Sequence, residues 1–201
     1  AFYLYSRLGA SDALADFRLM QPMDDAQGVS REDVRDMVEG LRERLEREPD
    51  DLRGWAMLAR SYMQLERYAA AADAYRGLAR AMEETGEGDP ASAWGLRAQA
   101  LFVGNQGRIT EAVEASISEA RSRNPDEINS LALRGIQAFR AQSYRDALDY
   151  WERILEIAPD HPQAESIRAG IGAAYSQLGE PVPPGALGAR ENEPGAASAP
   201  Q

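Results

Sequence analysis

The middle of the chain repeats one pattern of small and aromatic residues, and this repeat restricts the fold more than any other feature. Small residues recur at Ala71, Ala112 and Ala147, which are 41 and 35 residues apart. The apolar residues around them follow steps of three and four, the spacing of one face of an α-helix, and no stretch shows the sustained alternation of a strand. A helix pair of this size cannot bury its apolar face alone, so successive pairs must stack. The repeat therefore predicts an all-α helical solenoid without a sheet.

Three copies of the pattern can be followed along the chain. The first consists of Trp55, Leu58, Ala59, Tyr62, Tyr68, Ala71 and Tyr75. The second consists of Leu96, Ala100, Val103, Gly107, Ala112 and Ser116, and the third of Leu131, Gly135, Ala138, Tyr144, Ala147, Trp151 and Pro159. This order resembles the tetratricopeptide repeat, a helix pair of about 34 residues. Small residues let two helices approach closely, and we expect them to meet as Ala59 with Ala71, Ala100 with Ala112, and Gly135 with Ala147. The longer first spacing predicts a lengthened loop at residues 83–89.

The repeats lie in residues 30–179, between two segments of different composition. Ser30 and Asp33 have the spacing of a capping box, which predicts the start of the first helix, and residues 162–179 suit a capping helix that closes the stack. Residues 180–201 are rich in Pro, Gly and Ala and are predicted to be disordered, because they cannot bury enough apolar surface to offset their ordering entropy. Residues 1–29 begin with an aromatic stretch of the kind found where a membrane helix meets water. We expect them to follow a removed membrane anchor; a short amphipathic starter segment is the alternative.

The composition excludes most catalytic and metal-binding chemistry. The 201-residue chain has no Cys and a single His, so it lacks a thiolate nucleophile, a disulfide, a Cys-ligated metal site and a multi-histidine site. His161 lies in a Pro-Asp-His-Pro segment and is predicted to be a solvated turn residue. The 33 acidic and 22 basic side chains give a net charge of −11, which argues against a nucleic-acid-binding protein. We therefore expect no cofactor, no metal and no enzymatic activity.

Four segments in a fixed order point to a more specific family. They are Tyr3-Leu4-Tyr5-Ser6-Arg7-Leu8-Gly9, Met37-Val38-Glu39-Gly40-Leu41, the stretch from Gly54 to Tyr62, and Tyr150-Trp151-Glu152. Over about residues 1–179 the chain resembles the CcmI/CycH family of cytochrome c maturation proteins. The resemblance implies a periplasmic tetratricopeptide domain behind an anchor in the inner membrane. It also implies a chaperone that holds apocytochrome c, chiefly its C-terminal helical segment, beside the subunits of the haem-ligation complex. The chain departs from the pattern at Arg97, where an apolar residue is usual.

The same resemblance implies a concave groove lined by the first helix of each pair. Counted from Leu52, Ala93 and Ile128, its residues are Arg53, Arg60, Met63, Gln64, Trp94, Arg97, Leu101, Asn105, Asn129, Ile136, Phe139 and Arg140. We expect the apolar members to contact the apolar face of a bound peptide and the four arginines to bind its carboxylates. The alternative for the arginines is pairing with neighbouring glutamates on a solvated face. The alternative function is a general tetratricopeptide scaffold that assembles a protein complex without a cytochrome client.

Overall fold

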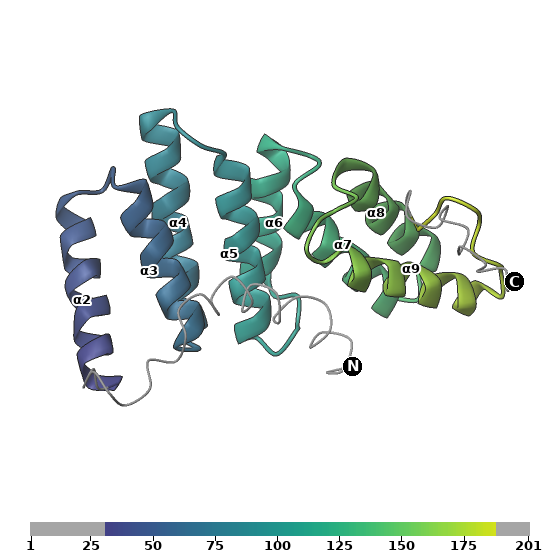
Figure 1. Ribbon diagram of the computed structural model, residues 1–201, viewed down its shortest axis with the longest axis horizontal. Helices are drawn as coiled ribbons and strands as arrows, with labels where there is room; N and C mark the ends of the chain where they lie inside the picture. Colours follow the sequence, from purple (N-terminus) through teal and green to yellow (C-terminus); the bar gives the residue numbers. More distant parts are fainter. Residues whose placement is uncertain (1–30, 188–201) are drawn as a thin grey trace, which may run out of the picture. The chain divides into compact units, whose positions relative to one another are not determined.

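The computed structural model describes residues 31–187, and this part of the chain contains eight α-helices and no strand (Figure 1). The helices are α2 (Arg31–Arg47), α3 (Leu52–Gln64), α4 (Tyr68–Thr85), α5 (Pro90–Gly104), α6 (Glu111–Arg123), α7 (Ile128–Arg140), α8 (Tyr144–Ile157) and α9 (Ala164–Leu178). The prediction of an all-α tetratricopeptide solenoid is confirmed. The predicted capping residue Ser30 and the aromatic N-terminal segment lie outside the described residues.

The described chain divides into two compact units, with the division inside α7. The N-terminal unit extends to Leu133 and contains α2 to α6, whose successive helices pack side by side in the order of the sequence (Figure 1). The C-terminal unit begins at Arg134 and contains α8 packed against α9.

One backbone motif ends the first helix of all three pairs. A residue with positive φ follows each helix, at Glu66 (56°), Gln106 (56°) and Gln142 (62°). The next amide donates to a carbonyl five residues back: Arg67 N to Tyr62 O (2.8 Å), Gly107 N to Phe102 O (2.8 Å) and Ser143 N to Ala138 O (2.9 Å). This is the hydrogen bond that closes a Schellman motif. The motif makes Tyr62, Phe102 and Ala138 equivalent, and so aligns the three first helices without reference to their side chains.

In the N-terminal unit α3 packs against α4, and both residues of the first predicted crossing are buried. Ala59 of α3 and Ala71 of α4 are both fully buried. Beside them the ring of Trp55 lies on Gly77, where an added Cβ atom would be 2.6 Å from the ring. The Trp55 Nε1–H group donates to the Pro49 carbonyl at 2.9 Å, which holds the ring in this orientation.

The second predicted crossing is wrong. Ala100 is buried, but Ala112 is exposed, and Val113, Ser116, Ile117 and Ala120 form the buried face of α6. The reason lies in the turn between α5 and α6. Helix α4 begins directly after the Schellman motif of the first pair, whereas three residues, 108–110, separate the second motif from α6.

The predicted lengthened loop is also shorter than expected, because residues 83–85 continue α4 and only residues 86–89 connect it to α5. Helix α4 has 18 residues, against 13 in α6 and 14 in α8. The additional length between the first two pairs is therefore mainly helical.

The C-terminal unit is built around Trp151, whose side chain is only 1% exposed. A Cβ atom on Gly135 would lie 2.2 Å from its Nε1 atom, and one on Gly170 would lie 3.1 Å from the same ring. Ala147 is fully buried beside it. The ring therefore fills the space between α7 and α9, and Gly135 approaches α8 at Trp151.

The structured chain continues past the predicted start of the tail. Glu180 forms an ion pair with Arg145 of α8, and the Leu187 carbonyl accepts a hydrogen bond from Arg168 Nε at 2.7 Å. Residues 180–187 thus contact α8 and α9, which corrects the predicted boundary. The remaining predicted tail, residues 188–201, lies outside the described residues.

Two further properties bear on function. Within residues 31–187 no helix combines the length and apolar character needed to cross a membrane. The same residues contain no group of three or more side chains suited to holding a metal ion. His161 lies in the turn between α8 and α9, as predicted, and its Nδ1 atom accepts a hydrogen bond from Gln163 N at 3.2 Å.

Candidate peptide-binding surfaces

Helix α3 presents one face to solvent and the other to the core. The helix begins at Asp51, whose carboxylate accepts a hydrogen bond from Gly54 N at 2.8 Å and caps the N-terminus. Because Leu58 and Tyr62 point into the core, the opposite side of the helix faces outward. Four predicted groove residues lie on that side; Arg53, Arg60 and Gln64 are exposed and Met63 is half-buried.

The two arginines of this face have no carboxylate partner among residues 31–187. Neither Arg53 nor Arg60 takes part in the ion pairs or side-chain hydrogen bonds of that part of the chain. The charge of Arg60 acts on Tyr75: burial raises the pKa of the Tyr75 hydroxyl, and Arg60 partly offsets this rise. The alternative interpretation, in which neighbouring glutamates neutralise these arginines, does not describe α3.

In the second pair, the predicted groove positions lie one residue too close to the C-terminus of α5. The Schellman motifs align Tyr62 with Phe102. The residues equivalent to those of the α3 face are therefore Ala93, Ala100, Val103 and Gly104. Ala93 and Ala100 are fully buried, so this part of α5 offers small and apolar side chains and no cation.

The predicted groove residues Trp94 and Arg97 instead pack among helices. Arg97 donates through Nη1 to Ser116 Oγ of α6, and its Cζ atom lies 5.5 Å from the centre of the Trp94 ring. The Cζ atom of Arg123, at the end of α6, lies 5.6 Å from the same ring. Burial lowers the pKa of Arg97, and the charge of Arg76 on α4 lowers it further. These residues thus support the contact of α5 with α4 and α6.

The other two predicted residues of α5 lie at its C-terminal end. Leu101 and Asn105 line a shallow cleft of about 500 Å³ together with Tyr68 and other residues at the start of α4. The Asn105 side-chain amide donates to the Leu101 carbonyl at 2.7 Å. This amide is therefore already used locally, whereas the Leu101 side chain remains partly exposed.

The register predicted for the third pair agrees with the Schellman alignment. Asn129 lies near the start of α7, where its amide group donates to Glu127 Oε1 at 2.8 Å. Ile136 and Phe139 are half-buried and Arg140 is exposed. The Phe139 ring lies 5.3 Å from the Tyr144 ring and 5.7 Å from the Trp151 ring, measured between centres. Part of the Phe139 surface is thus used in packing within the C-terminal unit.

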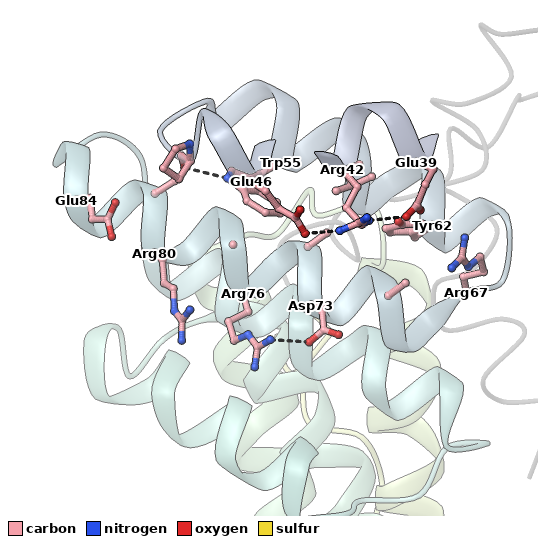
Figure 2. A pocket seen from close by; sticks show the side chains of 16 residues that line it. Glu39, Arg42, Glu46, Trp55, Tyr62, Arg67, Asp73, Arg76, Arg80 and Glu84 are labelled. Atoms are coloured by element: carbon pink, nitrogen blue, oxygen red, sulfur yellow. Dashed lines mark hydrogen bonds and ion pairs between the residues drawn. The ribbon is translucent and has the colours of Figure 1, made fainter. Parts of the chain in front are cut away.

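The structure also contains a surface that the sequence did not indicate. Helices α2 and α4 border an open cleft of about 540 Å³, here called the α2–α4 cleft, whose base is formed by Trp55, Leu58 and Tyr62 of α3 (Figure 2). No repeat position marks it, because it combines residues from three helices.

Comparison with known proteins gives one family. The family described as the cytochrome c-type biogenesis protein H TPR domain matches residues 10–164. Among curated proteins, the chain is 34% identical to the cytochrome c-type biogenesis protein CycH of Pseudomonas aeruginosa, over 90% of this chain and 42% of that protein. It is 26% identical to the cytochrome c-type biogenesis protein CcmH of Escherichia coli K12, over 83% of this chain and 45% of that protein.

A third relative belongs to another system. The formate-dependent nitrite reductase complex subunit NrfG of Escherichia coli O157:H7 is 24% identical over 65% of this chain and 64% of its own length. The chain spans less than half of the length of the CycH and CcmH relatives.

Proposed function

Because the chain belongs to the tetratricopeptide-domain family of the cytochrome c biogenesis proteins CcmH and CycH, we propose that it is a binding module in the maturation of c-type cytochromes and not an enzyme. Its relatives are named as cytochrome c-type biogenesis proteins, which supports a role in this process. The absence of Cys and the single His in the whole chain support a role in binding over one in catalysis.

The client in this proposal is apocytochrome c, held by its C-terminal helical segment. One observation carries the proposal: Arg53 and Arg60 lie on the exposed face of α3 and have no carboxylate partner in the described residues, although the chain has a net charge of −11. Uncompensated guanidinium groups bind carboxylates strongly and with defined geometry. Met63 on the same face adds a partly buried apolar contact, so the face suits an amphipathic segment with acidic groups.

The equivalent positions of α7 combine apolar side chains with one arginine. Ile136, Phe139 and Arg140 occupy the register positions of Arg60, Met63 and Gln64. In the C-terminal unit these three residues form a candidate client surface of their own, whereas Leu101, Asn105 and Asn129 belong with α3 to the candidate surface of the N-terminal unit. Trp94 and Arg97 are left out, because their side chains pack against α6 and α4.

The proposal places the module in the periplasm, joined to the inner membrane by an anchor and working beside the haem-ligation complex. The similarity of this chain to cytochrome c-type biogenesis proteins supports this placement. A maturation protein must capture its client before the client folds. The C-terminal helix of a folded cytochrome has already buried its apolar face, so a binding surface of this kind favours the unfolded state.

The test is a titration with a fluorescently labelled C-terminal peptide of an apocytochrome c from the same organism, followed by fluorescence anisotropy. The double variant Arg53→Glu/Arg60→Glu should bind at least ten-fold more weakly than the parent chain. The matched control Arg67→Glu/Arg80→Glu makes the same charge change on α4 and should bind within two-fold of the parent. Equal losses in both variants would indicate a general charge effect and would contradict the α3 surface.

A further inference from the structure

The α2–α4 cleft has a rigid aromatic base. The Trp55 ring lies against Gly77, where even a methyl group would approach it to 2.6 Å, and its indole N–H is bonded to the Pro49 carbonyl. Leu58 and Tyr62 continue the base along α3. A tryptophan that is already fixed in its bound orientation loses little entropy when a ligand covers it, which is typical of the residues that dominate protein interfaces.

The α4 wall of the cleft carries small residues. Ala70, Ala74, Gly77 and Ala81 occupy this wall at steps of three and four. Ala74 and Ala81 are buried and the Trp55 ring covers Gly77, so these residues serve the close approach of α3 to α4. The half-buried Trp55 ring is therefore the apolar surface that a partner can still contact.

Charge distinguishes the two walls (Figure 2). On α2, Arg42 is bonded to both Glu39 and Glu46, so its charge is compensated. On α4, Arg76 is paired with Asp73, but Arg67 and Arg80 have no carboxylate partner among the described residues.

Arg67 lies over the Tyr62 ring at 4.9 Å. Glu84 stands one turn beyond Arg80 without forming an ion pair with it. The two uncompensated arginines are 13 residues apart, about 20 Å along a helix.

The next helix pair along the chain provides a comparison. The Cζ atoms of Arg97 and Arg123 lie 5.5 Å and 5.6 Å from the centre of the Trp94 ring. There an ion pair of 2.7 Å between Arg123 and Glu83 joins α6 to α4. Among the residues that line the α2–α4 cleft, none forms a hydrogen bond or an ion pair from α2 to α4. The α2–α4 cleft thus lacks an ion pair that connects its two walls.

We propose that the α2–α4 cleft is a second docking site, which binds an acidic amphipathic helix of a partner protein. The helix is three to four turns long, presents large apolar side chains to Trp55, and places carboxylates beside Arg67 and Arg80. This site shares α3 with the proposed client surface but uses other residues of that helix. A single chain could therefore hold its client and a partner protein at the same time.

The experiment uses the full chain labelled with ¹⁵N and two synthetic 14-residue helical peptides. Both peptides carry Leu and Phe on one face; one has Glu beside that face and the other has Lys at the same positions. The indole N–H signal of Trp55 reports on the cleft, and those of Trp94 and Trp151 serve as internal references. We expect the Glu peptide to shift the Trp55 signal and the Lys peptide to bind at least ten-fold more weakly.

Matched variants assign the binding. Arg67→Glu/Arg80→Glu should weaken the Glu peptide at least ten-fold, whereas Arg53→Glu/Arg60→Glu should leave its affinity within two-fold of the parent. The four side chains are exposed, so both variants should fold. An unshifted Trp55 signal, equal binding of the two peptides, or full affinity of the Arg67/Arg80 variant would each overturn the proposal. The apocytochrome peptide depends on the opposite pair of arginines, so either site can fail without the other.

Discussion

Replacing Gly135 by Ala should destabilise the C-terminal unit, although the same change usually strengthens a helix. A Gly-to-Ala change in a helix interior is worth about 1 kcal/mol in favour of Ala. At Gly135, however, the new methyl group would lie 2.2 Å from Trp151 Nε1 and 2.5 Å from its Cδ1 atom. The ring cannot easily move away, because it is 1% exposed and Gly170 of α9 lies against it. Overpacking of this kind costs about 1–3 kcal/mol, so after the propensity gain we expect a net loss of up to about 2 kcal/mol.

Gly172 provides the matched control, because it lies in α9 and an added Cβ atom there would meet nothing within 4 Å. Gly172→Ala should raise the free energy of unfolding by about 0.5–1 kcal/mol. The assay is urea denaturation followed by circular dichroism, with the slope of each transition compared between variants. If Gly135→Ala stabilised the protein as much as Gly172→Ala, the placement of Trp151 against α7 would be refuted.

Three further predictions concern stability. Ala71→Leu should lower the free energy of unfolding by about 1–3 kcal/mol, because Ala71 is fully buried. Ala112→Leu should change it by less than about 0.5 kcal/mol, because Ala112 is exposed. Thermal melts of the two variants test the difference. Burial raises the pKa of the Tyr75 hydroxyl, so the unfolded chain loses this proton first and stability should fall as the pH rises above about 10; Tyr75→Phe should reduce that fall in urea titrations. Removing residues 188–201 should leave the urea midpoint unchanged, whereas removing 180–201 should lower stability by about 1 kcal/mol, because it also removes the groups bound to α8 and α9.

The sequence predicts the fold class and the first and third helix pairs well, because these depend on large side chains at helical spacing. Trp55 and Trp151 each require a small partner on a neighbouring helix, and the sequence supplies Gly77 and Gly135. The sequence of α5 specifies the register of its helix much less closely. Its buried residues include four alanines distributed around the helix, so several registers satisfy its apolar pattern equally well. The one-residue error in the second pair follows from this, and only the backbone motif at Gln106 corrects it.

The candidate surfaces could be predicted only in part. The residues on the exposed face of α3 follow from helical periodicity once the pair is recognised. Whether an arginine is compensated depends on which carboxylates come within reach in space, and the sequence does not determine that. Arg53 has no such partner, whereas Arg42 has two. The α2–α4 cleft requires the relative placement of three helices, and no spacing along the chain specifies it.

The central claim is that this module binds apocytochrome c before the cytochrome folds. The most direct measurement is the affinity of the chain for the C-terminal apocytochrome peptide and for the folded, haem-loaded cytochrome, by isothermal titration calorimetry at two salt concentrations. We expect the peptide to bind at least ten-fold more tightly than the folded cytochrome, and its affinity to fall as the salt concentration rises, because the arginines of α3 are exposed to solvent. Equal affinity for the peptide and the folded cytochrome would contradict the claim.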